Sequence, residues 1–295
     1  SLLRIAAVQH NHLAIPMQCL FNTIMAQHML IIGMGYTGGM LASALRTQGW
    51  RVTGVKREAD GPDILPFADE GAVRDHIGQA THILSSVPPT RDGDDPVLAL
   101  YGDAIAGSGA QWVGYLSSTG VYGDTGGAWV DEGAPIGTGR RTARADADAR
   151  WQKLHPAMRV FRLPGIYGPG RSALDRVRTE KAHRIDIEGQ IFSRIHVDDI
   201  IAAIIKSFDG PAGVYNIADD HPCPQNDVIA YAAALLGLPC PPLQSIEEAG
   251  LSPQARAFYA ENRRVANGKA KRLLGWRAQY PDYRRGLTAC LNNDE

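Results

Sequence analysis

Residues 28–38 read HMLIIGMGYTG, a short apolar run followed at once by a turn with three glycines. The spacing Gly33-x-Gly35-x-x-Gly38, after a strand and at the start of a helix, is typical of a dinucleotide-binding turn. In such a turn the first glycine permits the tight bend, the second lets the backbone approach a pyrophosphate, and the third lets helix and strand pack closely. The start of the helix then offers unpaired N–H groups to phosphate oxygens. We therefore predict a Rossmann-type cofactor site that includes Tyr36 and Thr37, with an ordinary strand-to-helix turn as the alternative.

The end of the second predicted strand indicates which dinucleotide is bound. It reads VTGVKR over residues 52–57, and Arg57 lies about 20 residues after the glycines, where an NAD-binding protein places an acid for the ribose. An arginine can pair with a 2′-phosphate through two parallel hydrogen bonds but offers nothing specific to a bare hydroxyl. We expect Lys56 and Arg57 to favour NADP(H), with NAD(H) as the second choice; alternatively these cations only solvate a strand end.

Outward from this turn, short apolar runs alternate with amphipathic stretches, which is typical of β-α-β units and a mostly parallel sheet. Strands are expected at residues 29–32, 50–55, 82–87, 112–117, 159–163 and 213–217, and helices at 38–47, 143–154 and 269–274. The predicted fold is therefore α/β, a Rossmann-type doubly wound parallel sheet with a small C-terminal substrate lobe. We expect an extension outside the core at 1–28, the cofactor-binding core at 29–170, and a mixed segment at 171–295 that completes the sheet and forms the lobe.

The composition argues against several classes of protein. With 295 residues, 44% of them apolar, the chain can bury a full-sized core without disulfides or metals. Its 30 Lys and Arg residues balance 31 Asp and Glu, so it lacks the positive field that attracts nucleic acid or acidic lipid. No apolar run reaches the roughly 18 residues of a membrane span, and the four cysteines are too widely spaced for a zinc site or a disulfide framework. We expect a cytoplasmic protein with a small-molecule substrate and no metal.

Four further stretches carry a resemblance to a known family. They are LSSTGVYGD at 116–124, RLPGIYGPGR at 162–171, RIHVDD at 194–199 and LLGW at 273–276. With the glycine turn, they resemble the extended branch of the short-chain dehydrogenase/reductase family, whose NAD(P)-dependent epimerases and dehydratases act largely on nucleotide sugars. The resemblance covers nearly everything after residue 28. It is compatible with a homodimer, because these enzymes often dimerise through helices.

The resemblance implies roles for three segments. Ser118, four residues before Tyr122, matches the hydroxyl that holds the reacting oxygen of the substrate; the alternative is a buried serine at a strand end. The loop at 164–166 matches the segment beside the nicotinamide, and the strand end at 85–88 matches the one that passes the cofactor's ribose, although either segment could be only a turn. The residues expected to contact the cofactor here are Ser85, Ser86, Val87, Pro88, Ser117, Pro164, Gly165 and Ile166.

The chain departs from this family at the catalytic pair. The family uses a tyrosine and a lysine four residues later, because the lysine lowers the pKa of the phenol and lets it exchange a proton near neutral pH. No tyrosine lies between Tyr122 and Tyr167 here, and alignment of the downstream helix puts Arg140 and Arg144 at the two positions. Arginine stays protonated in proteins, so neither residue can act as a general base. They could bind an anion, with a solvated helix face as the alternative.

Four other side chains are candidates for contact with the substrate. By the resemblance, Arg171 and Arg194 could meet a substrate diphosphate, for which planar donors are well suited; alternatively they form salt bridges between the lobes. By motif position, Tyr122 and Tyr167 are the phenols that could replace the missing acid/base.

Two functions remain open from the sequence. The first is an NADP-dependent oxidoreductase or epimerase/dehydratase-like enzyme on a sugar-like or nucleotide-sugar substrate. The second is a non-catalytic NADP(H)-binding redox sensor or scaffold, which has no need of a proton-transfer tyrosine. Fold alone does not separate them.

Overall fold

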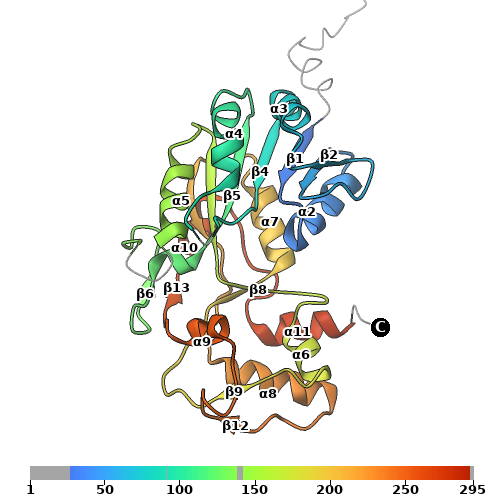
Figure 1. The fold of residues 1–295 in the computed structure, drawn as a ribbon. Helices are drawn as coiled ribbons and strands as arrows, with labels where there is room; N and C mark the ends of the chain where they lie inside the picture. The colour runs from blue at the N-terminus through green and yellow to red at the C-terminus, as the bar shows by residue number, and fades with distance from the viewer. Residues whose placement is uncertain (1–26, 91, 138–141, 293–295) are drawn as a thin grey trace, which may run out of the picture.

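The computed structural model describes residues 27–90, 92–137 and 142–292 and is built on a seven-stranded, all-parallel sheet (Figure 1). The strand order is β11-β7-β5-β4-β1-β2-β3, so the chain adds strands on one side of β1 and then returns to β4 on its other side. This reversal is the switch point at which doubly wound sheets bind their ligands. The strands are β1 His28–Ile32, β2 Arg51–Lys56, β3 Ile64–Pro66, β4 His82–Ser85, β5 Trp112–Ser118, β7 Met158–Leu163 and β11 Gly213–Asn216.

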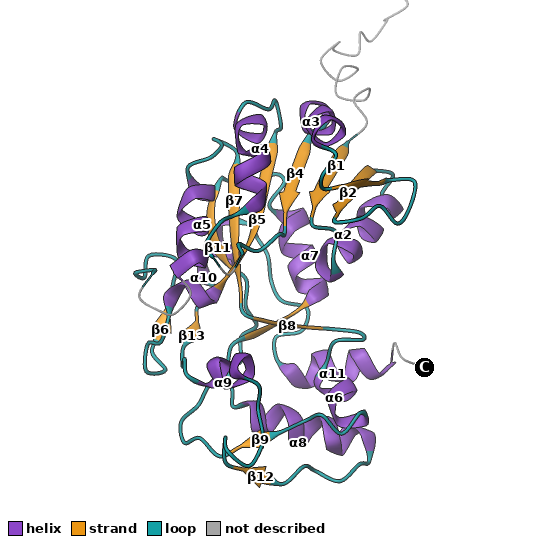
Figure 2. Cartoon of the chain, in the orientation of Figure 1, coloured by secondary structure: helices purple, strands orange, loops and turns teal. Residues whose placement is uncertain are grey.

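Helices cover both faces of the sheet (Figure 2), and its central strands are therefore buried along nearly their whole length. The helices whose apolar residues pack on one face are α2 Tyr36–Thr47, α7 Val197–Lys206 and α10 Gly268–Leu273. Those that pack on the other face are α3 Glu70–Gln79, α4 Pro96–Ala106 and α5 Thr142–Gln152. No helix in the described ranges is long and apolar enough to cross a membrane.

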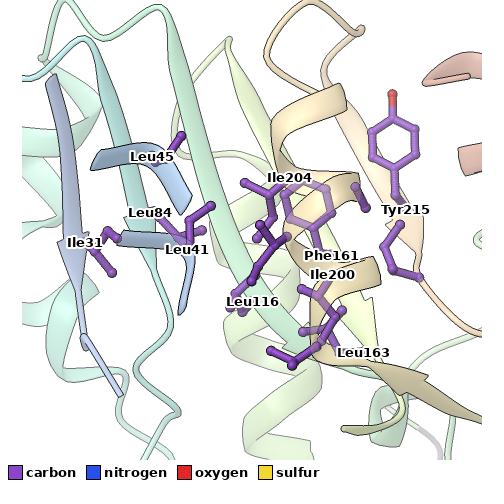
Figure 3. Close-up of a cluster of buried hydrophobic side chains, with 14 of the residues drawn as sticks. Ile31, Leu41, Leu45, Leu84, Leu116, Phe161, Leu163, Ile200, Ile204 and Tyr215 are labelled. Atoms are coloured by element: carbon purple, nitrogen blue, oxygen red, sulfur yellow. The ribbon is translucent and has the colours of Figure 1, made fainter. Parts of the chain in front are cut away.

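The core of the first face is formed by aliphatic side chains that interlock between strands and helices. In Figure 3, Leu41 and Leu45 of α2 lie near Leu84 of β4, while Ile200 and Ile204 of α7 lie near Phe161 of β7. These side chains are inaccessible to solvent. Burial of each contributes on the order of 1.5–3 kcal/mol, which holds the glycine turn between β1 and α2 in place.

A smaller lobe lies beyond the carboxyl ends of the sheet strands (Figure 1). Its separate apolar core joins α6 Ala173–Arg178, α8 Gln225–Leu236 and α11 Tyr283–Asn292. Its other elements are β9 Arg184–Ile185, β12 Leu243–Gln244 and α9 Pro253–Tyr259. Two short parallel pairs connect lobe and core: β8 Gly165–Tyr167 with β10 Arg194–His196, and β6 Trp129–Val130 with β13 Arg264–Val265. A 3-10 turn, η1 Thr119–Tyr122, follows β5 directly.

The predicted fold class is confirmed, and the elements differ from the sequence expectation by a few residues at their ends. β1 begins at His28, one residue before the expected start of the core. This histidine is buried, its backbone N–H donates to Thr81 Oγ1 at 3.0 Å, and its Nε2 lies 3.0 Å from Thr53 Oγ1. The segment after residue 171 contributes β11 to the edge of the sheet as well as the lobe. The expected extension lies outside the described residues except for its last two positions.

Candidate dinucleotide groove and substrate pocket

A groove of about 1250 Å³ runs along the carboxyl ends of β1, β2, β4, β5 and β7. It is the place where an open α/β sheet holds its ligand. The structure brings together at this groove most of the residues that the sequence predicted for the cofactor and the reaction. They are Gly33, Gly35, Tyr36, Thr37, Lys56, Arg57, Ser86, Val87, Pro88, Ser117, Ser118, Arg144, Pro164, Gly165, Ile166 and Arg171.

The three glycines of the turn have three separate reasons to be glycine. Gly33 has φ +91°, and a Cβ there would lie 2.7 Å from Cγ2 of Val87. A Cβ on Gly38 would lie 3.0 Å from Cγ2 of Ile31, so this residue lets α2 pack closely on β1. Gly35 has nothing within 4 Å of its would-be Cβ. It is the N-cap residue of α2, and no side chain caps this end of the helix. The start of the helix is therefore open toward the groove.

The two cations at the end of β2 differ in their surroundings. Lys56 Nζ lies 2.6 Å from Asp60 Oδ2, so its charge is already paired. Arg57 is exposed, lines the groove and has no ion-pair partner among the described residues. Arg57 is thus the cation at this end of the groove that can receive a further anion.

Two of the predicted cofactor residues lie away from the groove surface. Ser85, the last residue of β4, is fully buried, whereas the next residue, Ser86, reaches the groove. The Ser86 hydroxyl donates to the carbonyl of Gly33 and thereby ties β4 to the turn. Gly38 acts through packing within the helix and strand, as described above. Neither Ser85 nor Gly38 borders the groove.

Ser118 lies at the end of β5, where the groove meets a small hollow of about 130 Å³ on its lobe side. Its Oγ accepts a hydrogen bond from the Gly120 backbone N–H at 3.1 Å and caps η1. The side chain is partly exposed rather than buried. Ser118 therefore ends a strand and borders the groove, and it is not the buried serine of the alternative interpretation.

A buried polar network lies directly beneath the groove. Asp148 of α5 accepts from Ser117 Oγ at 2.6 Å and from Nε and Nη2 of Arg162 at 3.1 and 2.8 Å. Arg162 Nη1 also donates to the Tyr122 hydroxyl at 3.0 Å, which in turn donates to Asn216 Oδ1 at 2.7 Å. The network joins β5, β7, β11 and α5 at the level where the groove opens.

This network changes the interpretation of Tyr122. Its side chain is 1% exposed, and it borders none of the described hollows. Burial raises the pKa of its phenol above the usual value. Tyr122 therefore supports the strand ends from within and does not present its hydroxyl to a substrate.

Of the two arginines at the family's catalytic positions, the structure describes one. Arg144 belongs to the first turn of α5 and borders the groove. Arg140 lies outside the described residues. Asp148, one helical turn after Arg144, is a residue of this region that was not expected from the sequence. Its spacing puts it on the same face of the helix as Arg144, but its partner Arg162 is 14 positions away and meets it only in the folded chain.

A second pocket of about 650 Å³ lies in the lobe and shares Gly165, Ile166 and Arg171 with the groove. The guanidinium of Arg171 lies over the Tyr36 ring, 5.5 Å from its centroid, and the Tyr36 hydroxyl donates to the carbonyl of Pro169 at 3.0 Å. The glycine turn and the loop that enters the lobe are therefore in direct contact. The two hollows are therefore neighbours that share part of their walls.

Tyr167 and Arg194 border this lobe pocket but are held largely inside the protein. Tyr167 is 8% exposed, and its buried hydroxyl has no hydrogen-bond partner among the described residues. Burial raises its pKa above the usual value. Nη1 of Arg194 donates to Cys223 Sγ at 2.7 Å, and its guanidinium lies 5.7 Å from the Tyr283 ring. Neither side chain presents a free proton-accepting group to the pocket.

Several lining residues of the lobe pocket were not found from the sequence. They include Arg176, Lys181 and His183, which lie close together in the chain after α6 begins. Basic residues this close together in the chain are a weak signal, because such clusters are usually solvated surface. Only the packing of the lobe shows that they face a hollow.

Comparison with known proteins gives relatives that match along most of the chain. No protein-family model matches it. It is 27% identical over 285 residues to Protein YeeZ of Escherichia coli strain K12, which covers 85% of this chain and 96% of YeeZ. It is 26% identical over 297 residues to a 3-diazoavenalumate denitrifying reductase from a Streptomyces species, which covers 86% of this chain and 96% of the reductase.

Solved structures extend these similarities. A conserved protein of unknown function from Silicibacter pomeroyi is 45% identical, with a TM-score of 0.84, and the match covers 91% of this chain and 99% of that one. The human epimerase family protein SDR39U1 with NADPH is 17% identical, with a TM-score of 0.71 and coverage of 90% and 100%. The Bordetella bronchiseptica enzyme WbmG with NAD and UDP is 16% identical, with a TM-score of 0.70 and coverage of 91% and 96%. The chain is therefore a member of the same family as the Silicibacter pomeroyi protein and has the fold of the NAD-dependent epimerase/dehydratase-like, atypical short-chain dehydrogenase/reductases.

Proposed function

We propose that this chain binds NADP(H) in the groove and acts as an oxidoreductase on a small molecule held in the lobe pocket. The observation that carries the proposal is that the two neighbouring hollows share the lining residues Gly165, Ile166 and Arg171. A bound nicotinamide dinucleotide supplies hydride chemistry, while the protein binds and orients the reactants. Ser118 borders the groove close to the shared residues and is the hydroxyl that orients the reacting group.

The groove residues fit a dinucleotide. The uncapped first turn of α2 offers N–H groups and a positive helix end to a pyrophosphate, and the empty space at Gly35 lets it approach. Arg57 supports NADP(H), because an unpaired guanidinium at the ribose end suits a 2′-phosphate. The human protein of the same fold was solved with NADPH, and the Bordetella enzyme with NAD, so relatives of this fold hold either dinucleotide.

The side chains around the shared residues favour reduction. Arg144 remains protonated, and burial raises the pKa of the phenols of Tyr122 and Tyr167 above their usual value. None of these described groups can take a proton from a substrate hydroxyl near neutral pH, as an oxidation requires. A reduction needs the reverse transfer, in which the reduced atom takes a proton as NADPH gives its hydride, and solvent water in the groove can supply that proton. The Streptomyces relative is by name also a reductase.

The proposal is tested by binding and turnover measured on the same protein. NADPH and NADH are titrated by the change in protein fluorescence, and NADPH consumption is then followed with a panel of carbonyl and aryl substrates. We expect NADPH to bind more tightly than NADH and turnover to fall at least tenfold in Ser118→Ala, the loss of a hydrogen bond made to the developing charge. Failure of NADPH to bind would refute the proposal.

A second candidate is a non-catalytic NADP(H) sensor or scaffold. It is favoured by the same burial of both phenols, since a binding protein needs no proton transfer. In that case the dinucleotide would shift the lobe by binding one conformation more tightly than another. NADPH binding without turnover, and unchanged in Ser118→Ala, would select this function over the enzyme.

We also place the protein in the cytoplasm. In the described ranges Cys223, Cys240 and Cys290 are thiols rather than halves of disulfides, and Cys223 and Cys290 are buried. Proteins of oxidising compartments generally pair their cysteines, so these thiols fit a reducing one.

A further inference from the structure

The lobe pocket has a lining with one sign of charge. Its ionisable lining residues include Arg171, Arg176, Lys181 and Arg194, together with His183. In the described part of the chain, none of the residues that border it is an aspartate or a glutamate. A cleft with cations and no carboxylates concentrates anions.

Two of these cations are available to a ligand. Arg176 and Lys181 are exposed, and no described carboxylate lies within ion-pair distance of either. Arg194 is occupied by Cys223, and Arg171 lies over the Tyr36 ring. An anion in the pocket would therefore meet Arg176 and Lys181 first.

Part of the pocket lining is aromatic. The rings of Phe192 and Phe258 are stacked with their centroids 4.3 Å apart and their planes 8° from parallel, and Tyr259 meets both rings edge-on. Phe258 is 42% exposed, which is high for a phenylalanine that borders a hollow. A flat ring placed against this cluster would cover apolar surface now open to water.

The described lining has no carboxylate side chain to accept hydrogen bonds from a ligand's hydroxyls. The oxygen of Ser172 accepts from the Leu174 N–H, that of Ser252 from the Ala255 N–H, and that of Ser193 from the Val265 N–H. Gln225 is the one carboxamide among the described lining residues. The many hydroxyls of a sugar are donors as well as acceptors, and a buried donor without a partner is unfavourable. This lining therefore suits an anion better than a hydroxyl-rich ligand.

We propose that the lobe pocket binds an aryl carboxylate rather than a nucleotide sugar, with Arg176 and Lys181 pairing its carboxylate and the Phe258 cluster contacting its ring. This inference rests on the proposed function, in that the bound molecule is the substrate of the oxidoreductase. Its reducible group would lie toward Gly165 and Ile166, which border both hollows. The sequence alone had pointed to nucleotide sugars through the family resemblance.

The test uses three probes, each titrated calorimetrically into the whole protein with and without saturating NADPH: cinnamate, its neutral amide cinnamamide, and UDP-glucose. We expect cinnamate to bind best and cinnamamide at least tenfold more weakly, because the amide loses the charge that pairs with Arg176 and Lys181. The double variant Arg176→Gln/Lys181→Gln should bring cinnamate down to the affinity of cinnamamide. The control is Arg178→Gln on the same helix, outside the pocket lining, which should change neither affinity.

A further variant tests the aromatic side. Phe258→Ser should weaken cinnamate and cinnamamide by the same factor, since the amide keeps the ring, and a thermal melt of each variant shows that it is folded. Tighter binding of UDP-glucose than of cinnamate overturns the inference, as do equal affinities for cinnamate and cinnamamide or the absence of saturable binding by cinnamate. The titrations without NADPH decide the pocket chemistry by themselves, so a failure of NADPH to bind would refute the proposed function separately.

Discussion

The guanidinium of Arg171 lies 5.5 Å from the centre of the Tyr36 ring, and this contact joins the glycine turn to the loop that enters the lobe. Burial raises the pKa of Tyr36 to about 12, so its hydroxyl stays protonated at neutral pH and donates to the Pro169 carbonyl. Arg171 borders both the groove and the lobe pocket. One pair of side chains thus lies where the groove and the lobe pocket meet.

This contact should appear as an energetic coupling between the two residues. The double variant Tyr36→Leu/Arg171→Met removes both partners, and the two single variants remove one each. We expect a coupling of about 0.5–1 kcal/mol in the free energy of unfolding, the usual size of an exposed cation–π contact. Urea unfolding of all four proteins measures it. Strictly additive single effects would mean that the two side chains are neighbours without a stabilising contact.

Alanine substitutions in the glycine turn should separate folding from binding. Gly33→Ala places a Cβ at φ +91° and 2.7 Å from Val87, so we expect a loss of stability of about 1–3 kcal/mol. Gly35→Ala meets no atom within 4 Å, so the protein should keep its melting temperature but bind NADPH much more weakly, because the methyl group occupies the pyrophosphate position. Normal NADPH affinity in Gly35→Ala would show that the cofactor does not approach this turn.

The two cations at the end of β2 should contribute unequally to cofactor choice. Arg57→Gln should weaken NADPH binding by about tenfold and leave NADH binding unchanged, since hydrogen bonds between charged groups contribute about 1.5–3 kcal/mol. Lys56→Gln is the matched control, because Lys56 is paired with Asp60 at 2.6 Å and should have a smaller effect. The measurement is fluorescence titration with both dinucleotides. If wild-type protein binds NADH more tightly than NADPH, the assignment of the 2′-phosphate to Arg57 is wrong.

The buried pair of Asp148 and Arg162 should dominate the stability of the groove floor. Asp148→Asn leaves a buried guanidinium without its counter-charge, and breaking such a pair typically costs about 3–5 kcal/mol. Asp103→Asn breaks the exposed pair of Asp103 with Arg74 and should cost far less, because solvent screens that pair. Chemical denaturation of both variants measures the two losses of unfolding free energy. Equal losses in the two variants would mean that the buried network is relaxed or hydrated in solution.

Stability should fall as the pH rises from about 6.5 to about 8. Burial raises the pKa of Asp219 from its ordinary value to about 8. A carboxyl with a raised folded-state pKa binds more protons in the folded than in the unfolded chain, so the free energy of unfolding declines until the pH passes the folded value. Asp199, raised to about 6, and His82, lowered to about 4, both mainly by burial, act below this range.

The expected decline is about 1–2 kcal/mol, from 1.36 kcal/mol for each pH unit. Asp219→Asn should abolish it, because the amide does not titrate. Urea unfolding of both proteins at several pH values measures the slope. A wild-type stability that is constant or rising between about pH 6.5 and pH 8 would contradict the raised pKa.

Local sequence predicted the fold and the cofactor end of the site because the signals there are short-range. Gly33, Gly35 and Gly38 act on the backbone of one turn, and Arg57 follows from counting residues along one β-α-β unit. Strand alternation also makes Ser85 and Ser86 point to opposite sides. The sequence named both serines, but the end of β4 within the folded sheet decides which of them is buried.

The substrate end could not be predicted in this way. Tyr122 has the motif position of a substrate phenol, yet Arg162 and Asn216, 40 and 94 residues away, bind its hydroxyl inside the protein. Arg176 and Lys181 look like ordinary surface charges until the lobe places Phe192 and Phe258 beside them.

The sequence by itself therefore determined the doubly wound sheet, the glycine turn and the basic residue at the end of β2, since each depends on periodicity or spacing within a few dozen residues. Only the tertiary structure decided which phenols are buried, which cations are paired and which face a hollow. Burial and charge pairing depend on neighbours brought together by packing, and residues distant in the chain supply those neighbours.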